Sequence, residues 1–429
     1  MTEVVPMVPE ALGRALAGVR VLALEQAVAL PFATKHLADL GADVIRVQSY
    51  ERVRPADVSN IELTRSKRQI GLNLAAEGGP ELFLRLAAAS DVVAHNFTPR
   101  VVRRFGIDYE GVRAVNDDVI YVSLTGFGTT GPWGERPLFG PGAEAVAGYN
   151  LLVGDPEAWP GRPGTGVYAD DTCGLYAAFA VLAALEERDR TGAGQHIDVS
   201  LYETMVAHLG PVLAERARGA EPQRMLNADR RFAVHGVFDA AGHDRHVAIA
   251  ATEAQLPALV AALGIEAATE EAIAAAVADL DAADVARRLQ DAGVAAALVA
   301  DAALDTLTDP HLWARGFYGL RHIEEGPASG WYPHLGPTWG GPPPSIESPR
   351  DVGIDNTDVL RELAGLTDPE IAELEAAGVL GEVHAPATKR AVDDGWRLER
   401  RELSRIDTTL PDWREVAGHA TDATQAGAS

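Results

Sequence analysis

Short apolar runs alternate with helical patterns from the beginning of the chain. GVRVLALEQ (18–26) has the length and apolar content of a buried strand, and ADVIRVQ (42–48) is a second run of the same kind. Between them, PFATKHLADLG (31–41) has helical spacing, with proline in its first turn and glycine at its end. A strand–helix–strand unit of this kind predicts a parallel sheet with right-handed crossovers.

The same alternation continues to about residue 205. It predicts further strands and helices in ELFLRLAAASDVVAHNF (81–97), VIYVSLTGFG (119–128), YADDTCGLYAAFAVLAAL (168–185) and DRTGAGQHIDVSLYETMVAHL (189–209). We therefore expect an α/β protein with a doubly wound domain, in which ligands bind beyond the carboxyl ends of the strands.

The pattern changes after residue 210 and predicts a division into five segments. A polar, arginine-bearing stretch is typical of a linker helix, and two strands followed by alanine-rich helices predict a smaller α+β domain. A Pro/Gly-rich connection and two capped helices follow, before a charged extension. The predicted segments are a large domain (1–210), a linker helix (211–231), a small domain (232–325), a return to the large domain (326–382) and a C-terminal extension (383–429).

The composition of the chain argues against several kinds of binding partner and site. The formal net charge of −25 disfavours nucleic acid and anionic membranes as partners, although a local basic pocket can still bind a small anion. The single cysteine, Cys173, excludes an intrachain disulfide and argues against a thiolate metal site. The N-terminus lacks the pattern of a signal peptide, and the uncharged stretch 174–185 is shorter than the roughly 20 residues that span a bilayer. We expect a cytoplasmic protein without a metal.

Two neighbouring carboxylates, Asp170 and Asp171, stand just before that uncharged stretch. An aspartate at the start of a helix commonly caps it, because its oxygens accept backbone N–H groups at the positive end of the helix dipole. The same geometry also presents an ionised oxygen as a nucleophile. The spacing fits both interpretations.

Glycine-rich and basic segments are further candidates. The loop TGFGTTGPWGERP (125–137) would let a ligand approach the backbone, or forms an ordinary long turn. The sequence has neither a G-x-G-x-x-G between the first strand and helix nor a phosphate-loop lysine motif, so it gives little support to nicotinamide or nucleoside triphosphate chemistry. GHDRH (242–246) is typical of a solvated turn rather than a metal site.

Basic residues gather in two places, as Lys67–Arg68 and as Arg100, Arg103 and Arg104. Such clusters suit a ligand with several phosphates, because guanidinium and ammonium groups donate charged hydrogen bonds to phosphate oxygens. Taken alone, each cluster fits a solvated helix face with ion pairs slightly better.

Taken together, these segments resemble the class III coenzyme A transferases, a family that also includes 2-methylacyl-CoA racemases. The resemblance runs from about Gly18 to Gly381 in family order. Its motifs are GVRVLALEQAVALPFATKHLADLGADVIRV, SKRQIGLNL, HNFTPRVVRRFGIDYEGV, VIYVSLTGFGTTGPW, YADDTCGLYAAFAVLAALEERDRTGAGQHIDVSLYE, TDPHLWARGFY and SPRDVGIDNTDVLRELAGL.

The resemblance implies a Rossmann-like large domain, a small domain and an interlocked homodimer. It implies an enzyme that takes an acyl-CoA and a free carboxylic acid as substrates, with no permanently bound cofactor. The family's catalytic aspartate precedes a glycine by four positions, which identifies Asp170 with Gly174. The predicted coenzyme A site comprises Lys67, Arg68, Asn96, Phe97 and Arg104, with Gly126 and Gly128 of the glycine-rich loop.

The implied reaction passes through an aspartyl mixed anhydride and an aspartyl-CoA thioester. Gln48 and Ser49 stand where the family commonly has an acid followed by arginine. Where the racemases have a catalytic histidine and an aspartate, this chain has Phe139 and Gly140, so the second proton carrier needed for racemisation is missing. We therefore favour a transferase. An epimerase or intramolecular isomerase acting on one acyl-CoA, and a non-catalytic CoA-binding protein, stay as alternatives.

Overall fold

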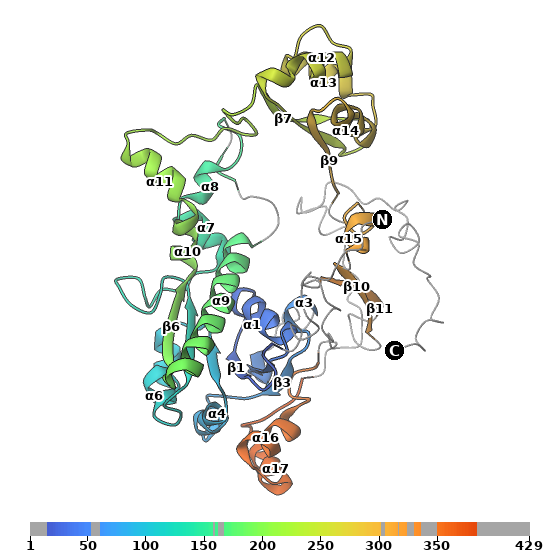
Figure 1. Cartoon of the computed structure of the whole chain (residues 1–429). Helices are drawn as coiled ribbons and strands as arrows, with labels where there is room; N and C mark the ends of the chain where they lie inside the picture. The colour runs from blue at the N-terminus through green and yellow to red at the C-terminus, as the bar shows by residue number, and fades with distance from the viewer. Residues whose placement is uncertain are drawn as a thin grey trace. The chain divides into compact units, whose positions relative to one another are not determined.

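The computed structural model describes residues 15–52, 61–157, 159–161, 167–301, 305–315, 317–323, 330–335 and 350–383 (Figure 1). These residues form two compact units, one from 15–149, 167–219 and 311–383 and the other from 150–161 and 220–310. The predicted extension after residue 383 and most of the Pro/Gly-rich connection, at 336–348, lie outside the described residues. The predicted domain boundaries stay predictions.

The first unit is built on a parallel sheet, as the strand–helix alternation predicted. Its strand order is β3-β2-β1-β4-β5-β6, so the direction of winding reverses between β1 and β4. The strands are β1 (Arg20–Leu24), β2 (Asp43–Gln48), β3 (Arg68–Gly71), β4 (Val92–His95), β5 (Ile120–Thr125) and β6 (Gln195–Ser200).

Alternate side chains of these strands form two separate cores. On β1, Val21 and Ala23 pack toward α1, α9 and α10, while Leu22 and Leu24 pack toward α4 and α16. Figure 1 shows α1 and α9 side by side on the first of these faces. The helices and turns of this unit are α1 (Ala29–Asp39), η2 (Tyr50–Arg52), α3 (Ile61–Thr64), α4 (Gly79–Ala88), α5 (Pro99–Arg104), α6 (Tyr109–Arg113), α7 (Gly140–Val146), α8 (Tyr149–Leu152, which continues into the second unit), α9 (Tyr168–Thr191), α10 (Leu201–His208), α11 (Gly210–Ala217), α15 (Pro310–Ala314, which begins in the second unit), α16 (Asn356–Ala364) and α17 (Asp368–Ala376).

Local sequence signals set where several of these helices begin and end. Gly192, with φ of +73°, closes α9 one turn beyond the end predicted near Arg188. Thr367 and Glu370 form the capping box that opens α17. None of the helices in the described part of the chain is both long and apolar enough to cross a membrane.

The predicted linker helix over 211–231 is wrong in most of its length. Only α11, Gly210–Ala217, is helical, and the residues after it form turns and irregular backbone. Gly219 has a φ of +88° and Pro222 lacks a backbone N–H, so the helical pattern is interrupted there.

The segment after residue 350 packs onto β3 of the first unit. The carboxylate of Asp355 accepts the backbone N–H of Gln69 at 2.7 Å, and Asn356 accepts that of Gly71 at 2.9 Å. Val359 and Leu360 of α16 then complete the core on that face of the sheet. The same unit includes a hairpin of β10 (Tyr318–Ile323) and β11 (Gly330–Leu335).

The second unit has a small antiparallel sheet in the order β7-β8-β9, covered by helices with their own core. The two strands predicted around the turn at 241–243 are confirmed as β7 and β8. Its elements are β7 (Val234–Asp239), β8 (His246–Ala251), η3 (Glu253–Gln255), α12 (Leu256–Leu263), α13 (Glu270–Val277), α14 (Ala282–Asp291) and β9 (Ala295–Val299).

Candidate active site

Asp170 lies in the first turn of α9, where this helix crosses the beginning of α1. The crossing is close because of Gly174: a Cβ there would lie 2.7 Å from the carbonyl oxygen of Ala29, too close for any side chain. The glycine four residues after the aspartate therefore lets α1 approach α9. This approach brings the first residue of α1 to the carboxylate of Asp170.

The carboxylate of Asp170 is held by two helices other than its own. Backbone hydrogen bonds reach it from Ala29 and Gly140, the first residues of α1 and α7. Backbone N–H groups in the first turn of a helix have no partner within that helix, so they are free to donate here. Asp170 is thus the acceptor for neighbouring helices, which separates it from an ordinary cap of α9.

Gly140 admits the carboxylate because it has no side chain. A Cβ at this position would lie 1.7 Å from Oδ2 of Asp170, well inside van der Waals contact. Together, Gly140 and Gly174 allow three helix N-termini to converge on one buried carboxyl group.

Burial sets the acidity of this group. It raises the pKa of Asp170 from 3.8 to about 6, helped by the nearby carboxylates of Asp171 and Glu144 and opposed by the two backbone hydrogen bonds. The group is still largely ionised at neutral pH. It is a stronger base than an exposed aspartate, which favours nucleophilic attack.

Glu144, Asp171 and Cys173 lie near Asp170 but differ from it in their hydrogen bonds and charged neighbours. The buried carboxylate of Glu144 accepts the backbone N–H of Ala169 at 3.3 Å, at the start of α9. The charge of Lys35 counteracts the burial that raises the pKa of Asp171. Burial raises the pKa of Cys173 to about 12, so this thiol stays protonated and is a poor nucleophile.

The ends of β1 and β4 are joined at the point where the sheet changes direction. The side-chain amide of Asn96 donates to the carbonyl of Gln26 at 2.7 Å, and its oxygen accepts the N–H of Gln26 at 3.0 Å. Phe97 follows, half-buried against the core that includes α4. Two predicted site residues therefore lie at the carboxyl edge of the sheet, where ligands of such folds bind.

Lys67, also predicted to contact coenzyme A, is fully buried in an ion-pair cluster. Its ammonium donates to Glu25 at 2.7 Å, to Thr34 at 2.7 Å and to the carbonyl of Pro31 at 3.0 Å. Burial lowers its pKa to about 8, while Glu25 opposes this effect. The contacts to Pro31 and Thr34 anchor the first turns of α1.

Arg46 extends this cluster along β2. Its guanidinium lies 3.1 Å from the carboxylate of Glu25 and donates to Gln48 at 2.8 Å. The side chain of Gln48 is thus a neutral acceptor beside a buried ion pair.

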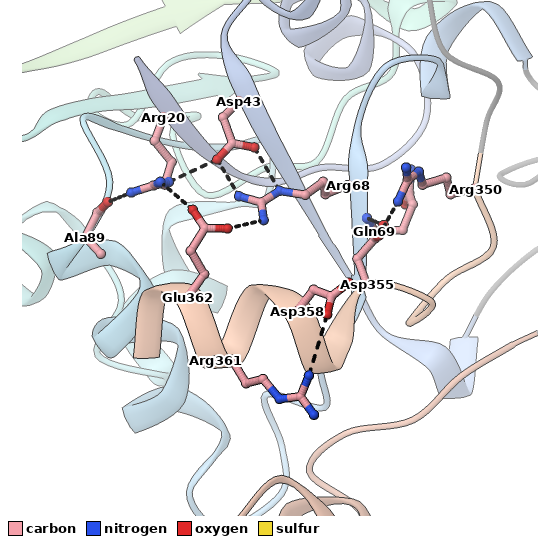
Figure 2. Close-up of polar contacts among 10 residues, drawn as sticks. All are labelled: Arg20, Asp43, Arg68, Gln69, Ala89, Arg350, Asp355, Asp358, Arg361 and Glu362. Carbon is pink, nitrogen blue, oxygen red and sulfur yellow. Dashed lines mark hydrogen bonds and ion pairs between the residues drawn. The ribbon is translucent and has the colours of Figure 1, made fainter. Parts of the chain in front are cut away.

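Arg68 lies on the other face of the sheet from Lys67, the face that α16 covers. Figure 2 shows its guanidinium between Asp43 of β2 and Glu362 of α16, with Arg20 sharing both carboxylates. The Nε–Oδ1 distance from Arg68 to Asp43 is 2.9 Å. This cluster fastens α16 to the sheet, so the guanidinium of Arg68 already has two acidic partners.

The other predicted residues lie along the loops after β4 and β5. Arg104 is exposed, with its guanidinium 5.4 Å from the ring centre of Phe105. Gly126 is buried and its carbonyl accepts the N–H of Tyr202 at 3.0 Å. Gly128 has a φ of +85°, a conformation that favours glycine. Within the described ranges, no group of three or more His, Cys, Asp or Glu side chains is placed to hold a metal ion.

A family model, CoA-transferase family III, matches residues 16–342. The chain belongs to this family. The beta subunit of succinyl-CoA–L-malate CoA-transferase from Chloroflexus aurantiacus is 36% identical over 201 residues, 44% of this chain and 50% of that one. The chain thus matches about half the length of that family III relative.

Two further comparisons extend over more of the chain. Succinyl-CoA–D-citramalate CoA-transferase of the same organism is 28% identical over 405 residues, 86% of this chain and 98% of that one. The crystal structure of a CAIB/BAIF family protein from Brucella suis is 30% identical, with a TM-score of 0.70, covering 82% of this chain and all of that one. The expected α/β fold is therefore confirmed, and it is shared with this crystal structure.

Sequence reasoning missed the backbone groups that contact Asp170. Ala29 has only a methyl side chain and Gly140 has none, so nothing in the sequence indicated that either residue would contact Asp170. A weak signal was available, because Pro31 and Pro141 mark the first turns of two helices near the site. Glu144 was missed because a single glutamate in an alanine-rich helix resembles a solvated residue.

Proposed function

We propose that this family III member transfers coenzyme A from an acyl-CoA to a free carboxylic acid, with Asp170 as nucleophile. The observation that carries the proposal is the buried carboxylate held by the backbone N–H groups of Ala29 and Gly140. A carboxylate is a weak nucleophile, so catalysis depends on positioning and on donors that stabilise developing oxyanions. Preorganised N–H groups at two helix starts supply such donors.

The proposed reaction has four steps. An oxygen of Asp170 attacks the thioester carbonyl and the C–S bond breaks. This step releases CoA thiolate and forms an acyl–aspartyl anhydride. The thiolate then attacks the aspartyl carbonyl, which releases the donor acid as a carboxylate and leaves an aspartyl-CoA thioester. The acceptor carboxylate attacks this thioester and expels the thiolate again. Attack of the thiolate on the acceptor's carbonyl gives the new acyl-CoA and frees Asp170.

We propose that coenzyme A lies over the carboxyl edge of the sheet. Asn96 and Phe97 mark the reversal of strand order, and Gly126 and Gly128 have no side chain at two positions of the loop after β5. Arg104 is exposed and suited to a phosphate. Because Lys67 and Arg68 already have buried or paired acidic partners, their predicted phosphate contacts receive no support from the geometry. The thioester enters as a substrate rather than as a bound cofactor.

We also propose that the enzyme is a homodimer, in keeping with the predicted interlocked pair. One side of α9 packs on α1, while Leu175, Tyr176, Phe179 and Leu182 on its other side are exposed. Phe179 is 73% exposed. An apolar face of this kind on a central helix is typical of a protein–protein interface, and a second copy of the chain is the proposed occupant.

The first experiment replaces the two neighbouring aspartates separately. CoA exchange is measured with a panel of acyl-CoA donors and carboxylic acids, using Asp170→Asn and, as a matched control, Asp171→Asn. We expect Asp170→Asn to lower kcat by at least about a thousandfold, because the nucleophile is lost, and Asp171→Asn to retain most of the rate. Near wild-type exchange by Asp170→Asn would overturn the proposal.

A second measurement separates transfer from isomerisation. The enzyme is incubated with an acyl-CoA in deuterated water without an acceptor acid. A transferase incorporates no α-deuterium, whereas a racemase or epimerase does. Rapid α-exchange would therefore favour the alternative function.

A further inference from the structure

Three polar side chains form a hydrogen-bonded row beneath the loop that carries Asn96 and Phe97. His95 of β4 contacts the hydroxyl of Ser123 on β5 at 2.9 Å through Nε2, and that hydroxyl contacts Nε2 of His196 on β6 at 2.9 Å. At the other end of the row, the backbone N–H of Phe97 donates to Nδ1 of His95 at 3.2 Å. The row therefore links the loop after β4 to the outer strand of the sheet.

The position of the proton on the His95 ring can be assigned from the contacts of that ring. Because Nδ1 of His95 accepts from Phe97, the neutral ring carries its proton on Nε2 and donates to Ser123. The hydroxyl oxygen of Ser123 accepts that bond, and it also contacts Nε2 of His196.

The surroundings keep both histidines neutral. Burial lowers the pKa of His95 to about 3, with a further contribution from His196. Burial also lowers the pKa of the half-buried His196, although the charges of Asp198 and Glu110 oppose it. The rings of Tyr109 and Tyr121 lie against His196, with centroids 5.0 and 5.5 Å away.

The row fixes one side of a loop whose other side Asn96 ties to Gln26. The side chain of Asn96 bonds the backbone of Gln26, while His95 accepts the N–H of Phe97. We propose that His95 is a positioning residue, which holds the Asn96–Phe97 backbone in the shape that receives the CoA thioester. This inference rests on the proposed function. Its physical basis is preorganisation, because a loop already fixed in its bound shape loses less entropy when ligand binds.

Two substitutions at position 95 test this role. The amide oxygen of Asn reaches approximately the position of Nδ1, so His95→Asn retains an acceptor for Phe97. The longer Gln places its amide near Nε2, so His95→Gln retains the contact to Ser123 but loses that acceptor. Loss of one buried hydrogen bond corresponds to about a fivefold to tenfold change in an equilibrium constant. We expect His95→Gln to weaken CoA binding by this factor and His95→Asn to rescue it to within about twofold of the wild type.

The measurements are the dissociation constant of CoA by calorimetry, and KM and kcat for an acyl-CoA donor. The inference requires a change in the dissociation constant and KM with kcat little altered, and His243→Gln, at an exposed histidine, serves as control. Equal dissociation constants for the Asn and Gln variants would overturn it. If His95→Gln does not fold, Ser123→Ala decides: weaker CoA binding supports the inference, and wild-type binding contradicts it.

The outcomes distinguish this inference from the proposed function. Full activity of Asp170→Asn would remove the proposed function whatever happens at position 95. An inactive Asp170→Asn together with indistinguishable His95 variants would remove only the positioning role. A nitrogen-15 spectrum of His95 gives an independent check, because the contact with Phe97 requires a neutral ring with its proton on Nε2.

Discussion

Replacing Asp170 by asparagine is expected to stabilise the fold while it abolishes the chemistry. In the native state Asp170 is 6% exposed and lies near two other carboxylates, Asp171 and Glu144. Two backbone N–H groups compensate only part of the cost of burial, since the pKa remains raised. An amide has the same shape and carries no charge, so its burial costs less.

The pKa gives the magnitude and the sign of this effect. A rise from 3.8 to about 6 corresponds to roughly 3 kcal/mol of folding free energy lost when the group is ionised. The pKa of the Asp170 carboxyl group is higher in the folded than in the unfolded state. The stability that the neutral carboxyl group gives the fold is therefore fully present below about pH 4 and is lost as the pH rises through about 6. The amide that replaces the carboxyl group does not titrate, so the gain of the variant should grow from near zero at about pH 4 to a plateau above about pH 7.

Urea unfolding of the wild type and Asp170→Asn between pH 4.5 and 8 measures this gain. We expect about 2–3 kcal/mol at pH 8 and less than about 1 kcal/mol at pH 4.5. Asp189→Asn, at the exposed end of the same helix, is the control and should change stability by less than about 0.5 kcal/mol. A gain that does not depend on pH, or a loss at pH 8, would refute the reasoning about the buried carboxylate.

Three further substitutions test other parts of the account. Gly140→Ala places a methyl group against Oδ2 of Asp170 and should lower kcat by about a hundredfold or more in a CoA-exchange assay; a wild-type rate would mean that this N–H is dispensable. Lys67→Met leaves Glu25 with fewer partners and should cost about 3 kcal/mol in urea unfolding, whereas a raised KM for the thioester at unchanged stability would restore the predicted CoA contact. Phe179→Glu should convert a dimer to a monomer in sedimentation, and an unchanged mass would show that this face of α9 is not the interface.

Periodicity was enough to predict the parallel sheet, whereas Asp170 was singled out by the resemblance to the family and not by its spacing. The apolar runs of β1 and β2 and the glycine after α1 reflect local chemistry, which a single sequence records. The Asp170–Gly174 spacing has a physical meaning that the structure supplies, because the glycine admits the backbone of Ala29.

What the sequence did not predict depends on contacts between distant segments. Lys67 and Arg68 are adjacent and both basic, yet one is buried with Glu25 and the other joins Asp43 to Glu362, almost 300 positions away. The backbone donors of Ala29 and Gly140 have no side-chain signature at all. The row from His95 to His196 becomes visible only when β4, β5 and β6 are placed side by side.

The most direct test of the central claim is to trap the covalent intermediate at Asp170. The enzyme is mixed with an acyl-CoA donor, treated with hydroxylamine or borohydride during turnover, digested, and examined by mass spectrometry. We predict a hydroxamate, or the reduced alcohol, on the peptide that contains Asp170, formed only when the donor is present. An unmodified Asp170 during active turnover, or a donor-dependent modification at another residue, would contradict the account.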